Sequence, residues 1–225
     1  MSERSKSPKL TSRFEEALTY AARAHWDHIR KVTPRENDGG AAPSDPAKEI
    51  PYVAHLLGVT SLVLEHGGGE DEAIAALLHD AIEDAGGTAR RDDIRARFGD
   101  EITRLVEACS DSDGENKAPW RERKERYLAH LAATTDPKVR LVSGCDKLHN
   151  ARAVLSDYEK IGEVLWERFN GKRPGTLWYY RALADEFARG GPEGVGNAIG
   201  RAVSELEELV RAADPEWKPE PPFRP

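Results

Sequence analysis

The 225-residue sequence contains few cysteines and no long hydrophobic run. Its two cysteines, Cys109 and Cys145, are far apart and form no CxxC pair, so we expect no disulfide scaffold and a reducing, cytoplasmic location. No apolar segment approaches the roughly 18–20 residues that span a bilayer. The N-terminal residues also lack the apolar stretch of a secretory signal. We therefore expect a cytoplasmic protein without a membrane partner.

The sequence has no excess of basic residues, because its formal net charge is −7 at pH 7. A negatively charged surface repels nucleic acid, so no nucleic-acid partner is expected. A small phosphorylated molecule stays compatible with this charge, since it needs only a few cations in one pocket. Hydrophobic residues make up 39% of the chain, which is enough for the core of one domain.

Strand patterns, a glycine-rich phosphate loop and internal repeats are missing, and apolar residues recur at helical spacing instead. The pattern predicts helices over residues 12–31, 53–66, 70–84, 93–98, 100–108, 120–133, 137–157, 176–189 and 194–213, with partial helix in 157–172. The segment 70–84 is apolar on several sides, so it is expected at the centre of the fold. The predicted fold class is all-α.

Four titratable residues lie close together in the predicted central helix: His79, Asp80, Glu83 and Asp84. In a continuous helix His79 and Glu83 stack one turn apart, and Asp80 and Asp84 stack beside them. Burying unpaired carboxylates costs several kcal/mol each, roughly, so this sector requires a cation or a wet cleft. The alternative is a solvated polar face with i, i+4 pairs.

Two residues elsewhere favour a metal site over that alternative. His55 lies on the preceding helix, which a short glycine-rich turn joins to the His79 helix, although a lone histidine there is also compatible with a core role. Asp146 interrupts an apolar helix face, where an internal ion pair with Lys147 or Arg152 is the alternative. Two imidazole nitrogens and two carboxylate oxygens suit a divalent ion such as Mn²⁺, Fe²⁺ or Zn²⁺.

The order of these residues resembles the HD-domain superfamily of metal-dependent phosphohydrolases. The resemblance is closer to the hydrolase domain of Rel/SpoT enzymes and to the stand-alone small alarmone hydrolases. It is carried by four motifs: residues 51–55 (PYVAH), 76–84 (ALLHDAIED), 98–99 (FG) and 146–150 (DKLHN). The resemblance implies an HD-domain helical bundle with a C-terminal helical extension. It also implies that His55, His79, Asp80 and Asp146 bind Mn²⁺, with Fe²⁺ or Zn²⁺ less favoured.

The same resemblance implies roles for six further residues. Glu83 and Asp84 would orient or deprotonate the attacking water, and Asn150 would contact the substrate nucleoside. Arg30 and Lys31 resemble a nucleotide clamp, although a cationic helix C-terminus is the alternative. Tyr180 resembles a residue of the nucleotide pocket, although aromatic residues at that spacing are also typical of a core.

Three departures from the family pattern concern the identity of the substrate and leave the metal ligands unchanged. Leu56 stands where the family usually has proline, and Ser143 replaces a lysine, which removes one cation from the phosphate side. The loop 32–50 is longer than the usual link between the basic pair and the PY motif. It is either a lid or a tolerated insertion.

The predicted function is Mn²⁺-dependent hydrolysis of a small-molecule nucleotide with a 3′-pyrophosphate, (p)ppGpp or a related alarmone, to GDP or GTP plus pyrophosphate. The alternatives are an HD-type nucleotidase or phosphatase for nucleoside monophosphates or NADPH, and a non-catalytic nucleotide sensor or antitoxin. Homo-oligomerisation stays open. The predicted organisation is a disordered lead-in (1–11), a hydrolase domain (12–190), a C-terminal helix packed on it (191–213) and a proline-rich tail (214–225).

Overall fold

The computed structural model describes residues 9–30, 50–84, 86–110 and 118–224, and for Asp84 only the backbone. Over these ranges the chain is helical, which confirms the predicted all-α class, and the single β-bridge joins Ile29 to Pro51. Within the same ranges, no helix is both long enough and apolar enough to cross a membrane. The helices are α1 Ser12–Ala24, α2 Val53–Glu65, α3 Glu70–Leu78, α4 Ala81–Asp84, α5 Gly87–Phe98, α6 Asp100–Cys109, α7 Trp120–Ala133, α8 Pro137–Ile161, the 3₁₀ helix η3 Gly162–Arg168, α9 Lys172–Gly190 and α10 Val195–Ala213.

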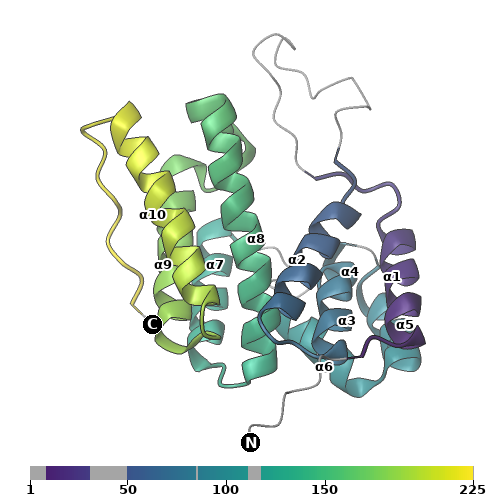
Figure 1. Cartoon of the computed structure of the whole chain (residues 1–225). Helices are drawn as coiled ribbons and strands as arrows, with labels where there is room; N and C mark the ends of the chain where they lie inside the picture. Colours follow the sequence, from purple (N-terminus) through teal and green to yellow (C-terminus); the bar gives the residue numbers. More distant parts are fainter. Residues whose placement is uncertain (1–8, 31–49, 85, 111–117, 225) are drawn as a thin grey trace, which may run out of the picture.

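The long helix α8 lies between two groups of helices (Figure 1). It packs against α2, α3 and α6 on one side and against α9 and α10 on the other. Its start is set by Asp136, whose side chain accepts a hydrogen bond from the Lys138 amide, and by Pro137 in the first turn. Gly144 permits close packing of the second group, because a Cβ there would lie 2.9 Å from Val195 and 3.1 Å from Phe187.

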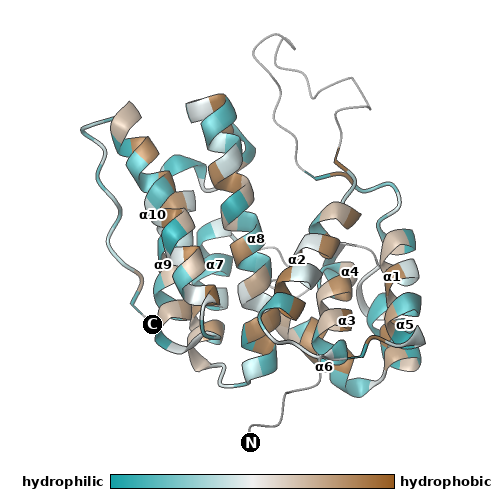
Figure 2. Ribbon diagram, in the orientation of Figure 1, coloured by the Kyte–Doolittle hydropathy of each residue, from teal (hydrophilic) through white to brown (hydrophobic). Residues whose placement is uncertain are grey.

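Helix α3 is at the centre of the first group, as its sequence predicts. Every residue from Glu72 to Leu78 is buried, and its neighbours are α1, α2, α6 and α8. Figure 2 shows hydrophobic colour over much of α2 and α3, whereas the outer helix α5 carries more hydrophilic residues. Because α3 contacts helices on several sides, the two ends of this short helix are held in fixed positions.

The first helix ends earlier than the predicted 12–31. It stops at Ala24, and the backbone N–H of His25 caps it by donating to the Ala21 carbonyl oxygen, while the His25 side chain is buried. Trp26 is 81% exposed, so the apolar pattern beyond Ala24 does not continue a buried face. The chain then runs extended and pairs Ile29 with Pro51.

The predicted helix 70–84 is also wrong in detail, because it is divided into α3 and α4 by a turn at His79 and Asp80. The prediction of a helix over 93–98 gave only its second half, since α5 begins at Gly87. Gly86 and Gly87 have φ values of 135° and 57°, which glycine adopts without strain, and this permits the sharp entry into α5.

The C-terminal region covers the second group of helices. Helix α10 packs on α8 and α9, and the segment after it is extended. Phe223 lies edge-on to Trp178 at 6.2 Å between ring centroids, and Glu220 accepts a 2.7 Å hydrogen bond from Arg121. The tail is therefore attached to α7 and α9. Most of the predicted lead-in and of the loop 32–50 lies outside the described residues.

Candidate metal centre

Four predicted ligands meet where the first group of helices contacts α8. His55 comes from α2, His79 and Asp80 from the turn between α3 and α4, and Asp146 from the middle of α8. His79 Nε2 lies 2.9 Å from Asp80 Oδ2 and 3.6 Å from Asp146 Oδ1. His55 Nε2 lies 3.6 Å and 3.3 Å from the same two oxygens. The ends of these four side chains thus converge on one small volume.

The orientation of His79 fits a metal ligand. Its Nδ1 lies 2.8 Å from the Ala76 carbonyl oxygen, which can only accept, so Nδ1 carries a proton and Nε2 is the nitrogen that binds an ion once it has released its own proton. Nε2 is buried and has no hydrogen-bond partner, since its short contact with Asp80 lacks hydrogen-bond geometry. His55, His79 and Asp80 offer ligand atoms within 4.8 Å of one another. A divalent ion would satisfy the buried nitrogen.

Asp146 divides its two carboxylate oxygens between two partners. Oδ1 faces the histidines, whereas Oδ2 accepts a 2.7 Å hydrogen bond from Lys147 Nζ. The ammonium group of Lys147 also lies 4.8 Å from the centre of the Tyr127 ring. The ion pair that was the alternative interpretation of Asp146 is therefore present, and it engages Oδ2 and not Oδ1. Oδ1 accepts a hydrogen bond from Asn150 and has a second lone pair for an ion.

The charges of the site shift the pKa values of its members in opposite directions. Burial alone would lower the pKa of His79, but Asp80 and Asp146 outweigh it and raise that pKa well above its ordinary value. Burial would likewise raise the pKa values of the two carboxyl groups. The neighbouring cations, His79 beside Asp80 and Lys147 beside Asp146, hold both of those pKa values low instead. The carboxylates are thus ionised and ready to bind a cation.

Arg30 and Asn150, two predicted substrate contacts, lie directly beside the ligands. Arg30 Nη2 donates a 3.0 Å hydrogen bond to Asn150 Oδ1, and Asn150 Nδ2 donates a 2.6 Å hydrogen bond to Asp146 Oδ1. Arg30 Nη1 lies 3.0 Å from His149 Nδ1. Because α1 ends at Ala24, Arg30 is not at a helix C-terminus, and that alternative interpretation is wrong for it.

The remaining predicted site residues lie on α4, on α9 or outside the described residues. Glu83 lies on α4 with an exposed side chain, whereas the side chain of Asp84 and all of Lys31 lie outside the described residues. Tyr180 is buried in α9. Burial raises its pKa to about 12, with smaller effects from Lys147, Asp146 and Arg30, so its hydroxyl group is within electrostatic range of the site.

Sequence reasoning missed three residues that support the site. Tyr52 donates a 2.5 Å hydrogen bond to Asp80 Oδ2, and His25 stacks on the Tyr52 ring at 5.0 Å. Burial and the nearby His28 lower the pKa of His25 to about 4. His149 lies 3.0 Å from His55, nitrogen to nitrogen. Tyr52 and His149 both belong to the motifs that carry the resemblance, which was the available signal for them.

Comparison with known proteins agrees with this geometry. The family model described as the HD domain matches residues 41–172. The chain belongs to the HD-domain family. A solved structure described as a metazoan ortholog of SpoT that hydrolyzes ppGpp is 25% identical, with a TM-score of 0.64 over 92% of this chain and 98% of that one. Lmo0812 from Listeria monocytogenes is 27% identical, with a TM-score of 0.59 over 69% and 97%.

Curated relatives of this HD-domain chain include guanosine-3′,5′-bis(diphosphate) 3′-pyrophosphohydrolase MESH1 from Xenopus tropicalis, which is 35% identical over 139 residues. The human protein of the same name is 34% identical over 139 residues. In both cases the alignment covers 61% of this chain and 66% of the relative. The chain thus matches slightly less than two thirds of the length of these relatives.

Proposed function

We propose that the protein hydrolyses a nucleotide that carries a 3′-pyrophosphate, with (p)ppGpp as the favoured substrate and Mn²⁺ as the metal. The names of the MESH1 relatives and the description of the SpoT ortholog support this substrate. The proposed hydrolase region is 12–190. The observation that carries the proposal is the buried Nε2 of His79, which has no hydrogen-bond partner and faces two carboxylates.

We assign the metal to His55, His79, Asp80 and Asp146. Mn²⁺ bound there would lower the pKa of a water molecule and neutralise negative charge on the phosphoryl oxygens. The preference for Mn²⁺ over Zn²⁺ is supported by the mixed nitrogen and oxygen donors. Among the described residues, the group that could hold a metal consists of His55, His79 and Asp80 and includes no cysteine.

The chain's own residues supply proton transfer and positioning. Glu83 and Asp84, on the short helix α4 that follows the turn at His79 and Asp80, are proposed to take the proton of the attacking water. The water oxygen forms the new bond to phosphorus, and the bond from phosphorus to the 3′ oxygen breaks. That oxygen takes up the proton that the water released and becomes a hydroxyl group. Arg30, Lys31, Asn150 and Tyr180 are proposed to bind the nucleotide.

A product assay with the full chain tests the proposal. Metal-free protein is mixed with ppGpp, and separately with GMP and NADPH, in the presence of Mn²⁺, Fe²⁺ or Zn²⁺. We expect pyrophosphate and GDP from ppGpp with Mn²⁺. Inorganic phosphate from GMP or NADPH, without pyrophosphate from ppGpp, would establish the nucleotidase alternative. Tight ppGpp binding without any product would establish the sensor.

A further inference from the structure

The two histidines of the metal centre are held by different kinds of partner. The Nδ1–H group of His79 donates to a backbone carbonyl, which has no other protonation state. The partner of His55 Nδ1 is instead His149 Nδ1, at 3.0 Å. A ring nitrogen can donate or accept, so the orientation of His55 depends on which of the two nitrogens carries the proton.

Arg30 lies close to both of these ring nitrogens. Its Nη1 lies 3.0 Å from His149 Nδ1 and 3.4 Å from His55 Nδ1, and a guanidinium group only donates. Arg30 therefore donates toward His149 Nδ1, which acts as the acceptor. When His55 binds an ion through Nε2, its neutral ring carries its one proton on Nδ1, and His149 Nδ1 at 3.0 Å accepts that proton together with the one from Arg30. His55 Nε2 then has its lone pair toward Asp80 and Asp146.

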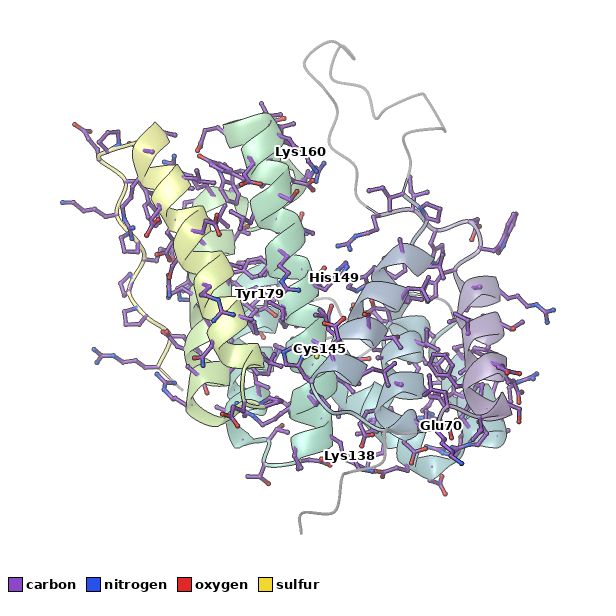
Figure 3. All side chains as sticks on the ribbon, viewed as in Figure 1. Glu70, Lys138, Cys145, His149, Lys160 and Tyr179 are labelled. Carbon is purple, nitrogen blue, oxygen red and sulfur yellow. The ribbon has the colours of Figure 1, made fainter. Side chains whose placement is uncertain are left out.

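The ring of His149 packs against α2 at Gly58. Figure 3 shows His149 in the space between α8 and α2. A Cβ on Gly58 would lie 2.3 Å from His149 Nε2 and 2.4 Å from Cδ2, so the ring rests against bare backbone one turn beyond His55. Any side chain at position 58 would have to displace this ring.

We propose that His149 is a positioning residue that accepts the Nδ1 proton of His55 and so directs His55 Nε2 to the metal. Gly58 provides the space for the ring, and Arg30 lies within hydrogen-bond distance of its Nδ1. The inference rests on the metal-binding part of the proposed function. It also gives Arg30 a second role, because a nucleotide that draws Arg30 away from His149 would loosen the orientation of a metal ligand.

Three variants of the full chain test the acceptor role, with Mn²⁺ affinity measured by calorimetry without any substrate. His149→Leu removes the acceptor and is expected to weaken Mn²⁺ binding by about 10- to 100-fold, the usual effect of losing a partner of a metal-binding histidine. His149→Asn retains an acceptor and is expected to stay within a few-fold of the parent. Gly58→Ala displaces the ring and is expected to resemble His149→Leu.

A spectroscopic measurement on the Zn²⁺-loaded protein is independent of both affinity and turnover. The Nδ1 proton of His55 is expected as a downfield resonance, protected from exchange, in the parent and in His149→Asn. It is expected to be absent or rapidly exchanging in His149→Leu. The matched control is Gly200→Ala in α10, where an added Cβ meets nothing within 4 Å, and both measurements should stay unchanged in it.

Two results overturn the inference. One is parent-like metal affinity and an unchanged resonance in folded His149→Leu. The other is an equal loss in His149→Asn and His149→Leu, which would show that bulk rather than the acceptor matters. If His149→Leu does not fold, Gly58→Ala and His149→Asn still give opposite expectations. Failure of ppGpp hydrolysis would leave these metal measurements untouched, so the two proposals fail separately.

Discussion

Replacing Asp146 with alanine is expected to destabilise the metal-free protein much more than replacing Asp80 with alanine. Both residues are proposed ligands, so both variants should lose the metal. Their other partners differ, however. Asp146 is the carboxylate partner of Lys147, whose side chain is 14% exposed, whereas Asp80 faces His79 and receives a hydrogen bond from Tyr52.

The expected loss of stability depends on whether the remaining partner, His79 or Lys147, can lose its charge at pH 7. His79 without Asp80 can release its proton near pH 7 at little cost, because the ordinary pKa of histidine is about 6.5. Lys147 without Asp146 must stay charged or lose its proton, and losing it at pH 7 from an ordinary pKa of about 10.4 costs about 4.6 kcal/mol. Stranding a buried charge typically costs about 3–5 kcal/mol. We therefore expect a loss of about 3 kcal/mol or more for Asp146→Ala and about 1–2 kcal/mol for Asp80→Ala.

The assay is urea unfolding at pH 7 in the presence of EDTA, followed by circular dichroism. The double variant Asp146→Ala/Lys147→Met is the control that isolates the ion pair. It is expected to recover most of the lost free energy, because methionine can pack against Tyr127 without carrying a charge. It should not recover metal binding, since Asp146 is still missing.

Two outcomes would refute this reasoning. If Asp146→Ala and Asp80→Ala unfold with equal free energies in EDTA, the ion pair does not determine the stability of this region. If the double variant is no more stable than Asp146→Ala, the cost lies in lost packing around α8 and not in the stranded charge of Lys147.

Four further predictions concern single changes. Treatment with EDTA should abolish pyrophosphate release from ppGpp and Mn²⁺ should restore it; release that persists after elemental analysis shows no metal would contradict the assignment. Arg30→Ala should raise the KM for ppGpp by about tenfold or more, the loss of one charge-assisted hydrogen bond, whereas exposed Arg23→Ala should not change it. Gly200→Ala should raise the free energy of unfolding by about 0.5–1 kcal/mol in a urea titration, because alanine favours the helix. Thr11→Ala should lower it by about 1 kcal/mol, because the Thr11 hydroxyl caps α1 by accepting from the Arg13 amide.

Helix positions could be predicted well from the sequence where apolar periodicity reflects burial. Helix α7 has the predicted bounds, and α2 and α10 each differ from the prediction by one terminal residue. The errors occurred where contacts distant in sequence decide the local conformation. Helix α1 stops at Ala24 because His25 stacks on Tyr52 and the next residues pair with Pro51, and neither contact is visible in a helical pattern.

The candidate site could be predicted less completely than the fold. Chemical type and motif spacing pointed to the four converging side chains, and their role as ligands stays a prediction. The argument that placed Glu83 in a buried sector assumed an unbroken helix, whereas the turn at His79 and Asp80 leaves Glu83 exposed. The contact between His149 and His55 depends on how α8 crosses α2, which no local pattern encodes.

Because of the position of α8, a bound metal would stabilise the packing of this helix against its neighbours. The proposed donors come from both α8 and the helices on one side of it, while α9 and α10 pack on its other side. A bound ion would then stabilise the contact between α8 and these helices. Every tenfold excess of free metal over its Kd adds about 1.4 kcal/mol to the stability of the state in which α8 packs against them. Trimming Val195, which contacts α8 at Gly144, should loosen that helix and lower the affinity for the ion. Metal titration would thus measure how firmly the two groups of helices are joined, even for substitutions remote from the ion.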